Sequence, residues 1–238
     1  MKRRILVFCL SAILIVGMLS GCSNGTDTDT GTNTPSDSSS DSDVIKIGVF
    51  EPMTGANAAG GQMTVEGIEL ANEKFPEVLG KKVQLVVVDN KSEKVDAANA
   101  ASKLIEKDKV VAIIGSYGSS LSMAAGDIVK NAKVPAVGCS PTNPLVTLNN
   151  DYYFRVCFID PFQGTVMANY AFNELGAKKA AIIQDVQNDY SVGLSKYFVD
   201  AFKELTGDPD SIVATTSYNA GDQDFSAQLT NVRSLNPD

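Results

Sequence analysis

The 238-residue chain contains no histidine. This absence excludes Ser-His-Asp triads and HExxH zinc sites, and it removes the side chain that most often acts as a general base. Carboxylate chemistry remains conceivable, because Asp160, Asp185 and Asp189 lie near the ends of predicted strands. Carboxylates at such positions more often cap helices or bind amines. The sequence therefore disfavours an enzyme, and it calls for no cofactor and no metal.

Motifs for nucleotide binding are also missing. Gly55 and Gly60 have the spacing of a P-loop, but Gly61 and Gln62 stand where that motif needs Lys and Ser or Thr. Without the lysine, no charge is present to hold the β- and γ-phosphates. No GxGxxG follows any predicted strand, which counts against a dinucleotide enzyme.

Positive charge is scarce: 20 Lys and Arg stand against 28 Asp and Glu, for a net charge of −8. Loss of the first residues, with Lys2, Arg3 and Arg4, would lower the net charge by three, to −11. Such a surface repels nucleic acid and anionic lipid headgroups, so neither is expected as a partner.

Cysteine is scarce too, with four in the chain. Cys9 and Cys22 lie near the N-terminus, which leaves Cys139 and Cys157. Both lie in strand-like runs, where a buried free thiol is the commoner finding. An exported compartment would also permit a disulfide between them, so both alternatives stay open.

The N-terminus has the pattern of an export signal. A basic start, Lys2-Arg3-Arg4, precedes an apolar run over residues 5–19, and the run closes with Leu19-Ser20-Gly21-Cys22. The run is short for a membrane-spanning helix, although an uncleaved signal anchor is the alternative. The closing tetrapeptide resembles a bacterial lipobox. This resemblance implies lipid attachment at Cys22 and cleavage before it, so residues 1–22 are predicted to be a lipoprotein signal peptide.

Residues 23–43 are dominated by Ser, Thr, Asp, Asn and Gly, with no basic and no large apolar residue. Such a composition cannot bury enough surface to offset the entropy of ordering the chain. We expect a disordered tether that holds a domain away from a membrane.

From Val44 onward, strand patterns alternate with helical patterns. Strands are predicted over residues 45–50, 83–89, 110–115, 136–139, 153–158, 180–184 and 212–217, and helices around 65–75, 97–105, 121–129, 162–170, 194–205 and 229–232. The strands are continuous Val/Ile runs and most are followed by a helix. This favours an α/β fold with a mostly parallel sheet covered on both faces.

Two stretches of small hydroxyl residues follow predicted strands. In the first, Ser119 or Ser120 stands where the N-cap of a helix is expected; the second holds Ser140 and Thr142. A helix N-terminus presents free N–H groups and a positive dipole, so an anion such as a carboxylate is the expected guest. The same hydroxyls would also satisfy nearby backbone in an ordinary turn, and the residues alone leave this open. Tyr190, before a later helix, is either a loop aromatic or a group that closes over a ligand.

A set of short motifs recurs in order along the chain. They are Lys46-Ile-Gly-Val with Met53-Thr-Gly55, Ile114-Gly115-(x)3-Ser119, Val134-Pro135-(x)6-Thr142-Asn-Pro144, Phe154-Arg155, Asp160-(x)2-Gln163-Gly164 and Asp189-Tyr190-Ser-(x)-Gly193. The ordered set resembles the branched-chain amino-acid (leucine/isoleucine/valine) binding proteins of ABC transporters. This resemblance implies a two-lobed type I periplasmic-binding-protein fold.

The resemblance also implies domains and site residues. A first ligand-binding lobe would cover residues 44–157, and a second, incomplete lobe residues 158–238. Ser119 matches the family's carboxylate-binding serine, Ser140 and Thr142 match two binding positions of the next loop, and Tyr190 matches the tyrosine of the second lobe. One departure is Gly60, where relatives often place an aromatic residue against the ligand side chain.

We therefore predict an exported, lipid-anchored, monomeric solute-binding protein, on the extracytoplasmic face of the membrane or in the periplasm. It would capture an amino acid, of branched-chain type or a related small carboxylate, and deliver it to an ABC transporter permease. A sensor of the same fold that reports an amide or short-chain compound is the alternative, and a carboxylate-dependent hydrolase is a third. Genomic neighbours would separate transporter from sensor, since a permease gene favours the first and a kinase gene the second.

Overall fold

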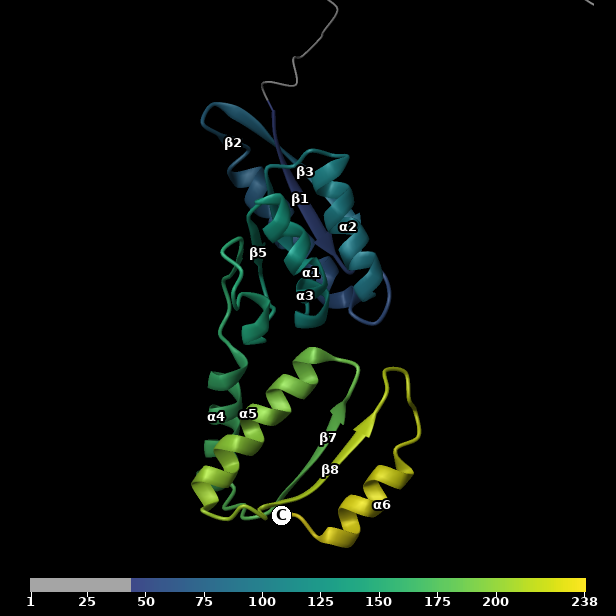
Figure 1. The fold of residues 1–238 in the computed structure, drawn as a ribbon, viewed down its shortest axis with the longest axis vertical. Helices are drawn as coiled ribbons and strands as arrows, with labels where there is room; N and C mark the ends of the chain where they lie inside the picture. Colours follow the sequence, from purple (N-terminus) through teal and green to yellow (C-terminus); the bar gives the residue numbers. More distant parts are fainter. Residues whose placement is uncertain (1–43) are drawn as a thin grey trace, which may run out of the picture. The chain divides into compact units, whose positions relative to one another are not determined.

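The computed structural model describes residues 44–238, so the predicted signal peptide (1–22) and tether (23–43) lie outside the described residues. The first elements along the chain are β1 (Val44–Glu51), α1 (Ala58–Lys74), β2 (Glu77–Val78), β3 (Lys81–Asp89), α2 (Lys94–Glu106), β4 (Ala112–Gly115), α3 (Ser119–Ala132), β5 (Ala136–Gly138) and β6 (Tyr153–Arg155). They are followed by α4 (Asp160–Asn169), β7 (Ala180–Asp185), α5 (Asp189–Thr206), β8 (Ile212–Tyr218) and α6 (Ser226–Leu235) (Figure 1). A short 3-10 helix, Pro144–Val146, precedes β6, and a π-helical turn, Tyr170–Glu174, ends α4.

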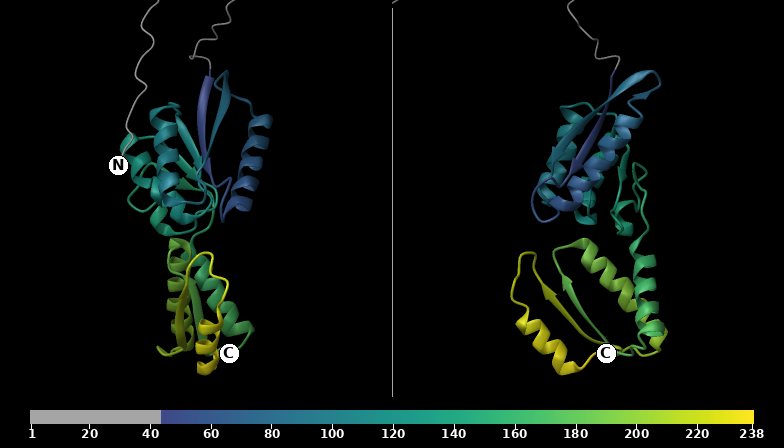
Figure 2. Two further views of the ribbon diagram at one scale, coloured as in Figure 1. Left: turned by 90° about the vertical axis from the view of Figure 1, so that its right-hand side faces the viewer. Right: turned by 180° about the vertical axis from the view of Figure 1, so that it is seen from behind.

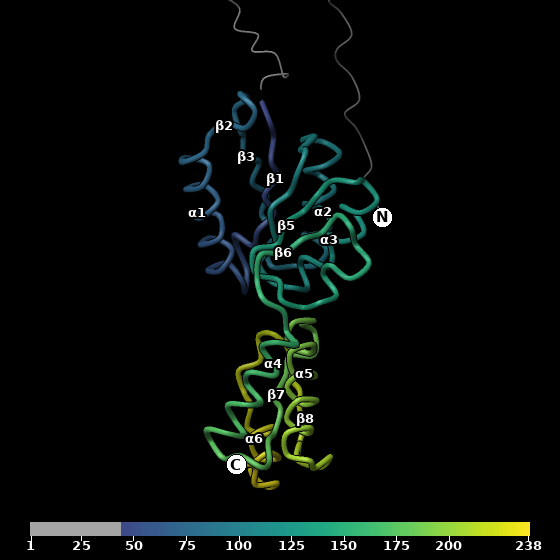
Figure 3. The backbone as a smooth tube through the Cα atoms, turned by 90° about the vertical axis from the view of Figure 1, so that its left-hand side faces the viewer, coloured from purple at the N-terminus to yellow at the C-terminus, as the bar shows by residue number. Residues whose placement is uncertain are grey.

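Six strands form one sheet in the order β2-β3-β1-β4-β5-β6. Only the pairing of β2 with β3 is antiparallel, and β1 runs parallel to both β3 and β4. Helix α1 lies on one face of this sheet and α2 and α3 on the other (Figure 3). Successive strands are added on opposite sides of β1: β3 lies on one side and β4 on the other. In an open α/β sheet, the carboxyl ends of strands at such a point are where ligands bind.

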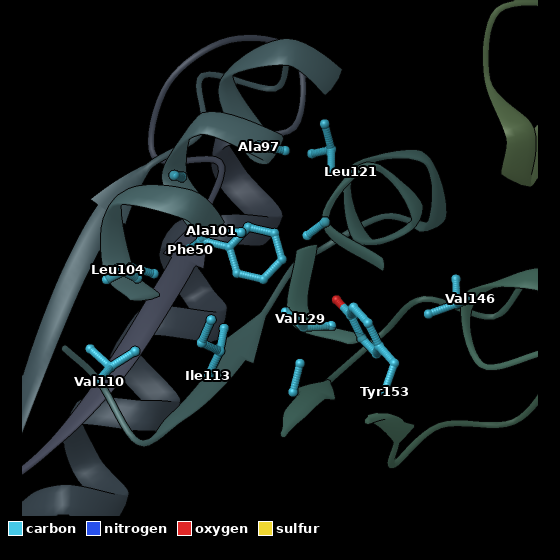
Figure 4. Close-up of a cluster of buried hydrophobic side chains, with 13 residues drawn as sticks. Phe50, Ala97, Ala101, Leu104, Val110, Ile113, Leu121, Val129, Val146 and Tyr153 are labelled. Atoms are coloured by element: carbon cyan, nitrogen blue, oxygen red, sulfur yellow. The ribbon is translucent and has the colours of Figure 1, made fainter. Parts of the chain in front are cut away.

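The alternation of side chains along β1 supplies both layers of the core. Val49 packs with Val65 and Ile68 of α1, whereas the next residue, Phe50, packs in the larger cluster beneath α2 and α3. In that cluster Phe50 lies among aliphatic side chains, and Tyr153 of β6, the edge strand of this sheet, belongs to the same cluster (Figure 4). A parallel strand buried on both faces needs apolar residues in succession, which is why residues 47–50 of β1 contain no charged or polar side chain.

The remaining strands, β7 and β8, form a separate parallel pair. Helices α4 and α5 pack against each other beside β7, and α6 packs beside β8 (Figure 2). The contact between α4 and α5 depends on Gly164, because a Cβ there would lie 2.7 Å from the backbone nitrogen of Phe198.

The alternation of strands and helices, the parallel sheet and its coverage on both faces are as predicted, with differences at the boundaries. The strand predicted to begin at residue 110 begins at Ala112, and the one predicted over 153–158 ends at Arg155. The two-residue strand β2 was not predicted. It is exposed and pairs only with the edge of β3, so it carries no apolar pattern.

The predicted serine N-cap is wrong. Gly118 is the N-cap of α3 and makes no side-chain cap bond, and both Ser119 and Ser120 lie inside the first turn. Their hydroxyls bond to other parts of the chain instead, as described below. Cys139 and Cys157 are free, partly exposed thiols.

Candidate functional site

The sequence-predicted residues Ser119, Ser140, Thr142 and Tyr190 all line one cleft. Its volume is about 900 Å³. The other lining residues come from the loop after β1, the starts of α2 to α5 and the end of β8, and they include Asn57, Lys94, Tyr117, Phe158, Gln163 and Tyr218. The cleft thus lies where the strand order predicts a ligand site, at the carboxyl ends of the strands.

Ser119 is buried at the first turn of α3, with 1% of its surface exposed. Its Oγ accepts a hydrogen bond of 3.1 Å from the backbone N–H of Asn143, which leaves the hydroxyl hydrogen free to donate. The N–H of Ser122 donates to the carbonyl of Gly118, so the N–H groups of the residues before Ser122 have no acceptor within the helix. Together these donors favour an anion at this point of the cleft.

Ser140 and Thr142 supply two further donors. The Oγ of Ser140 and the Oγ1 of Thr142 are buried, and neither has a hydrogen-bond partner among the described residues. Buried hydroxyls without partners are rare in folded proteins, since each costs about 1 to 3 kcal/mol. Because both residues line the cleft, a bound ligand could supply the missing partner.

Asp160 lies behind Thr142, as the first residue of α4. It is fully buried, and its N–H donates to the carbonyl of Thr142 at 2.9 Å. Burial raises the pKa of Asp160, while the nearby side chains of Thr142 and Arg155 lower it less. The Thr142 hydroxyl is close enough to act on this pKa but makes no hydrogen bond of good geometry to the carboxylate.

Tyr190 enters the cleft from the second residue of α5. Its phenol oxygen accepts a hydrogen bond of 3.1 Å from Nε2 of Gln163, so its own O–H remains able to donate. The side chain of Asn188 caps the helix by accepting from the Tyr190 N–H, which fixes the backbone below the ring.

Asp189 connects α5 to the elements around the first sheet at three points. Its N–H donates to Oγ of Ser120 at 2.8 Å, and its carbonyl accepts from Nδ2 of Asn143 at 2.9 Å. Its carboxylate forms a 2.8 Å ion pair with Lys94 at the start of α2. Burial raises the pKa of Asp189, but the bonds with Lys94 and Ser120 lower it further, below its usual 3.8. Of Asp160, Asp185 and Asp189, the three aspartates considered from sequence, Asp189 is the one whose carboxylate pairs with a lysine side chain of this chain.

Glu51 supports the site from beneath. It ends β1, is fully buried, and its Oε2 accepts a 2.6 Å hydrogen bond from the N–H of Tyr117. Its other oxygen has no partner among the described residues. Burial raises the pKa of Glu51 to about 8, and the bond from Tyr117 opposes this only in part. At neutral pH the carboxyl is therefore mostly protonated.

Sequence reasoning did not select Lys94, Tyr117 or Gln163 as site residues. Lys94 and Gln163 each lie five residues after the end of a predicted strand. This position near a strand end was the only sequence feature that could have marked them as site residues. Tyr117 stands inside the predicted anion loop, between Gly115 and Ser119, but nothing in the sequence shows where its ring points. Within residues 44–238 no group of three or more acidic or cysteine side chains could hold a metal ion. None of the helices in this range is long and apolar enough to cross a membrane.

The chain thus has two α/β units, and one cleft is lined by strand ends and helix N-termini of both. This arrangement is the type I periplasmic-binding-protein fold. The family model described as periplasmic binding protein matches residues 44–238, and the chain belongs to this family.

Among its relatives, the chain is 34% identical over 196 residues to an amino acid binding protein of Pseudomonas aeruginosa, covering 80% of this chain and 51% of that protein. The leucine binding protein LivK of Thermotoga maritima is 49% identical with a TM-score of 0.77, over 81% of this chain and 54% of that one. LivJ of Streptococcus pneumoniae, in complex with isoleucine, is 35% identical with a TM-score of 0.74, over 82% and 55%. The chain thus spans about half the length of these relatives.

Proposed function

We propose that this protein captures an amino acid, of branched-chain type or a related small carboxylate, as the solute-binding component of an ABC importer. The observation that carries the proposal is the pair of buried hydroxyls without partners, Ser140 and Thr142, beside the first turn of α3. A carboxylate placed there would accept from both hydroxyls, from Ser119 and from free helix N–H groups. Binding of this kind involves no catalytic step.

Capture would couple to closure of two lobes, residues 44–157 and 158–238. Ser119, Ser140 and Thr142 belong to the first lobe and Tyr190 to the second, so a ligand held by both would favour the closed form. The three bonds of Asp189 also join the two lobes. These bonds stabilise the closed form only weakly. The ion pair with Lys94 is half exposed, and an exposed pair contributes at most about 1 kcal/mol of stability. The ligand would supply the remaining free energy of closure.

The closed, loaded form would dock on a membrane permease. We place the protein outside the cytoplasm, held to the membrane by a lipid on Cys22, and we expect it to act as a monomer. The membership in the periplasmic-binding family and the signal-like sequence of residues 1–22 support this placement.

Replacing Ser119 or Thr142 with alanine tests the carboxylate site. We expect either change to weaken amino-acid binding by roughly 1 to 3 kcal/mol, because a buried charged group then loses one hydrogen bond. Isothermal titration of the natural, exported protein with leucine, isoleucine and valine measures this. Thr165→Ala is the control, because Thr165 is exposed and its hydroxyl bonds to Pro161 of its own helix. Unchanged affinity in both site variants would remove these residues from the site.

Replacing Cys22 with serine tests the anchor. A serine hydroxyl cannot take the place of the lipid-bearing thiol, and each buried CH₂ of an acyl chain contributes about 0.8 kcal/mol to membrane binding. We expect the variant to move from the membrane fraction to the soluble fraction after cell breakage. The control is Cys9→Ser, within the apolar run, which should leave the protein on the membrane. Retention of the Cys22 variant on membranes would contradict lipidation at this residue.

A further inference from the structure

The ring of Tyr117 lies directly against Gly60. A Cβ built on Gly60 would be 2.7 Å from Cε1 of that ring, and closer still to Cζ and Cε2. Ordinary carbon–carbon contacts begin near 3.5 Å, so any side chain on residue 60 would occupy the space of the ring. Gly60 and Tyr117 are therefore a matched pair, in which the missing side chain of one makes room for the other.

The backbone is fixed on both sides of this contact. Gly60 lies in the first turn of α1, where its carbonyl accepts a 2.9 Å bond from the hydroxyl of Thr64. The N–H of Tyr117 donates to the buried Glu51, and its carbonyl accepts from Oγ of Ser116 at 3.3 Å. Neither backbone can move away easily, so a side chain at residue 60 could be accommodated only if the Tyr117 ring turned aside.

The ring faces the cleft. Tyr117 lines it and is 37% exposed, and it stands two residues before Ser119, which lies in the anion-binding turn. Three further aromatic residues line the same cleft: Phe158 from the segment between β6 and α4, Tyr190 from α5 and Tyr218 from the end of β8. A ligand whose carboxylate lies at Ser119 would thus have an aromatic surface within reach of the rest of its structure.

We propose that Tyr117, seated on Gly60, is the wall that contacts the side chain of the bound amino acid and limits its size. This inference rests on the proposed function and adds to it the residue that sets specificity. An aromatic ring suits this role because it offers a large apolar face with few rotatable bonds. Tyr117 lies in the loop after β4, two residues before Ser119. One short segment would therefore contact both the carboxylate and the side chain of the ligand.

The first test measures size preference. Tyr117→Ala removes the wall, and we expect the affinity for phenylalanine relative to valine to rise roughly tenfold or more, the range that apolar pockets give for changes of side-chain size. Tyr117→Phe keeps the ring and is expected to restore the size preference of the natural protein. Titration calorimetry with alanine, valine, leucine and phenylalanine measures the ranking in each variant.

The second test measures the coupling between the two residues. Gly60→Ala forces the Tyr117 ring to move, so it should change the ligand ranking in the natural background. In the Tyr117→Ala background the same change meets an empty space and should have little effect. Contacting residues give such non-additive results, whereas independent ones do not. Gly67→Ala is the control in the same helix, since a Cβ there meets nothing within 4 Å.

Two failures are distinguishable. If the natural protein binds no amino acid of the series, the proposed function is wrong and the inference falls with it. If it binds them, but Tyr117→Ala keeps the same ranking or the Gly60 and Tyr117 changes are additive, the function stands and Tyr117 is not the specificity wall. A changed ranking restored by Tyr117→Phe, together with non-additivity, supports the inference.

Discussion

Replacing Gly61 with alanine is expected to destabilise the fold by about 3 kcal/mol or more, the upper part of the range for overpacked cores. Gly61 is buried where α1 crosses the chain after β1, and a Cβ there would lie 2.8 Å from the carbonyl carbon of Pro52 and closer to its oxygen. The obstacle is backbone, which cannot turn aside as a side chain could. Urea denaturation followed by circular dichroism measures the loss.

Gly67 supplies the matched control for this prediction. It lies in the same helix, but a Cβ there meets nothing within 4 Å. Gly67→Ala should therefore stabilise the protein by roughly 0.5 to 1 kcal/mol, because alanine costs less backbone entropy than glycine in a helix. Opposite signs for the two changes are the expected result. A gain of similar size in both would show that helix propensity, and not the contact with Pro52, governs position 61.

Replacing Glu51 with glutamine is expected to change how stability depends on pH. The pKa of Glu51 is raised from its ordinary value of 4.5 to about 8. A raised pKa means that the folded state holds the proton more tightly than the unfolded state does. The stabilisation from this group is complete below pH 4.5 and is lost as the pH rises to about 8, with an upper limit of about 5 kcal/mol. Glutamine does not ionise and retains an oxygen to accept from Tyr117.

The difference in unfolding free energy between Glu51→Gln and the natural protein should therefore grow in favour of the variant from pH 5 to pH 9. Urea denaturation at pH 5, 7 and 9 measures it, and taking the difference cancels the contribution of the other titrating groups. Glu66→Gln, an exposed change on α1, controls for removal of a carboxylate as such. A difference that stays the same at all three pH values would mean that Glu51 is ionised in the folded protein at neutral pH.

Part of the candidate site could be predicted because it depends on local rules. Strand ends, helix starts and small hydroxyl residues can be read from sequence, and parallel strands bring their carboxyl ends to one edge. Ser119, Ser140, Thr142 and Tyr190 were selected in this way together with the family resemblance, and all four line the cleft. Their role as ligand contacts remains a prediction.

The N-cap assignment shows where local rules stop. A serine before an apolar periodic run is a typical cap, yet Gly118 caps α3 and the serines bond across the structure, Ser119 to Asn143 and Ser120 to Asp189. These partners lie 24 and 69 residues away in the chain. A hydroxyl bonds to whichever group packing brings near, and sequence spacing does not contain that information.

The sequence by itself determined the alternation of strands and helices, the parallel sheet and the candidate hydroxyls, because apolar periodicity and turn chemistry act over a few residues. Only the tertiary structure decided that Tyr117 rests on Gly60, that burial raises the pKa of Glu51, and that Asp189 meets Lys94. Each of these depends on atoms from distant segments meeting at the strand ends. Steric exclusion and desolvation act between such atoms only once the chain has packed.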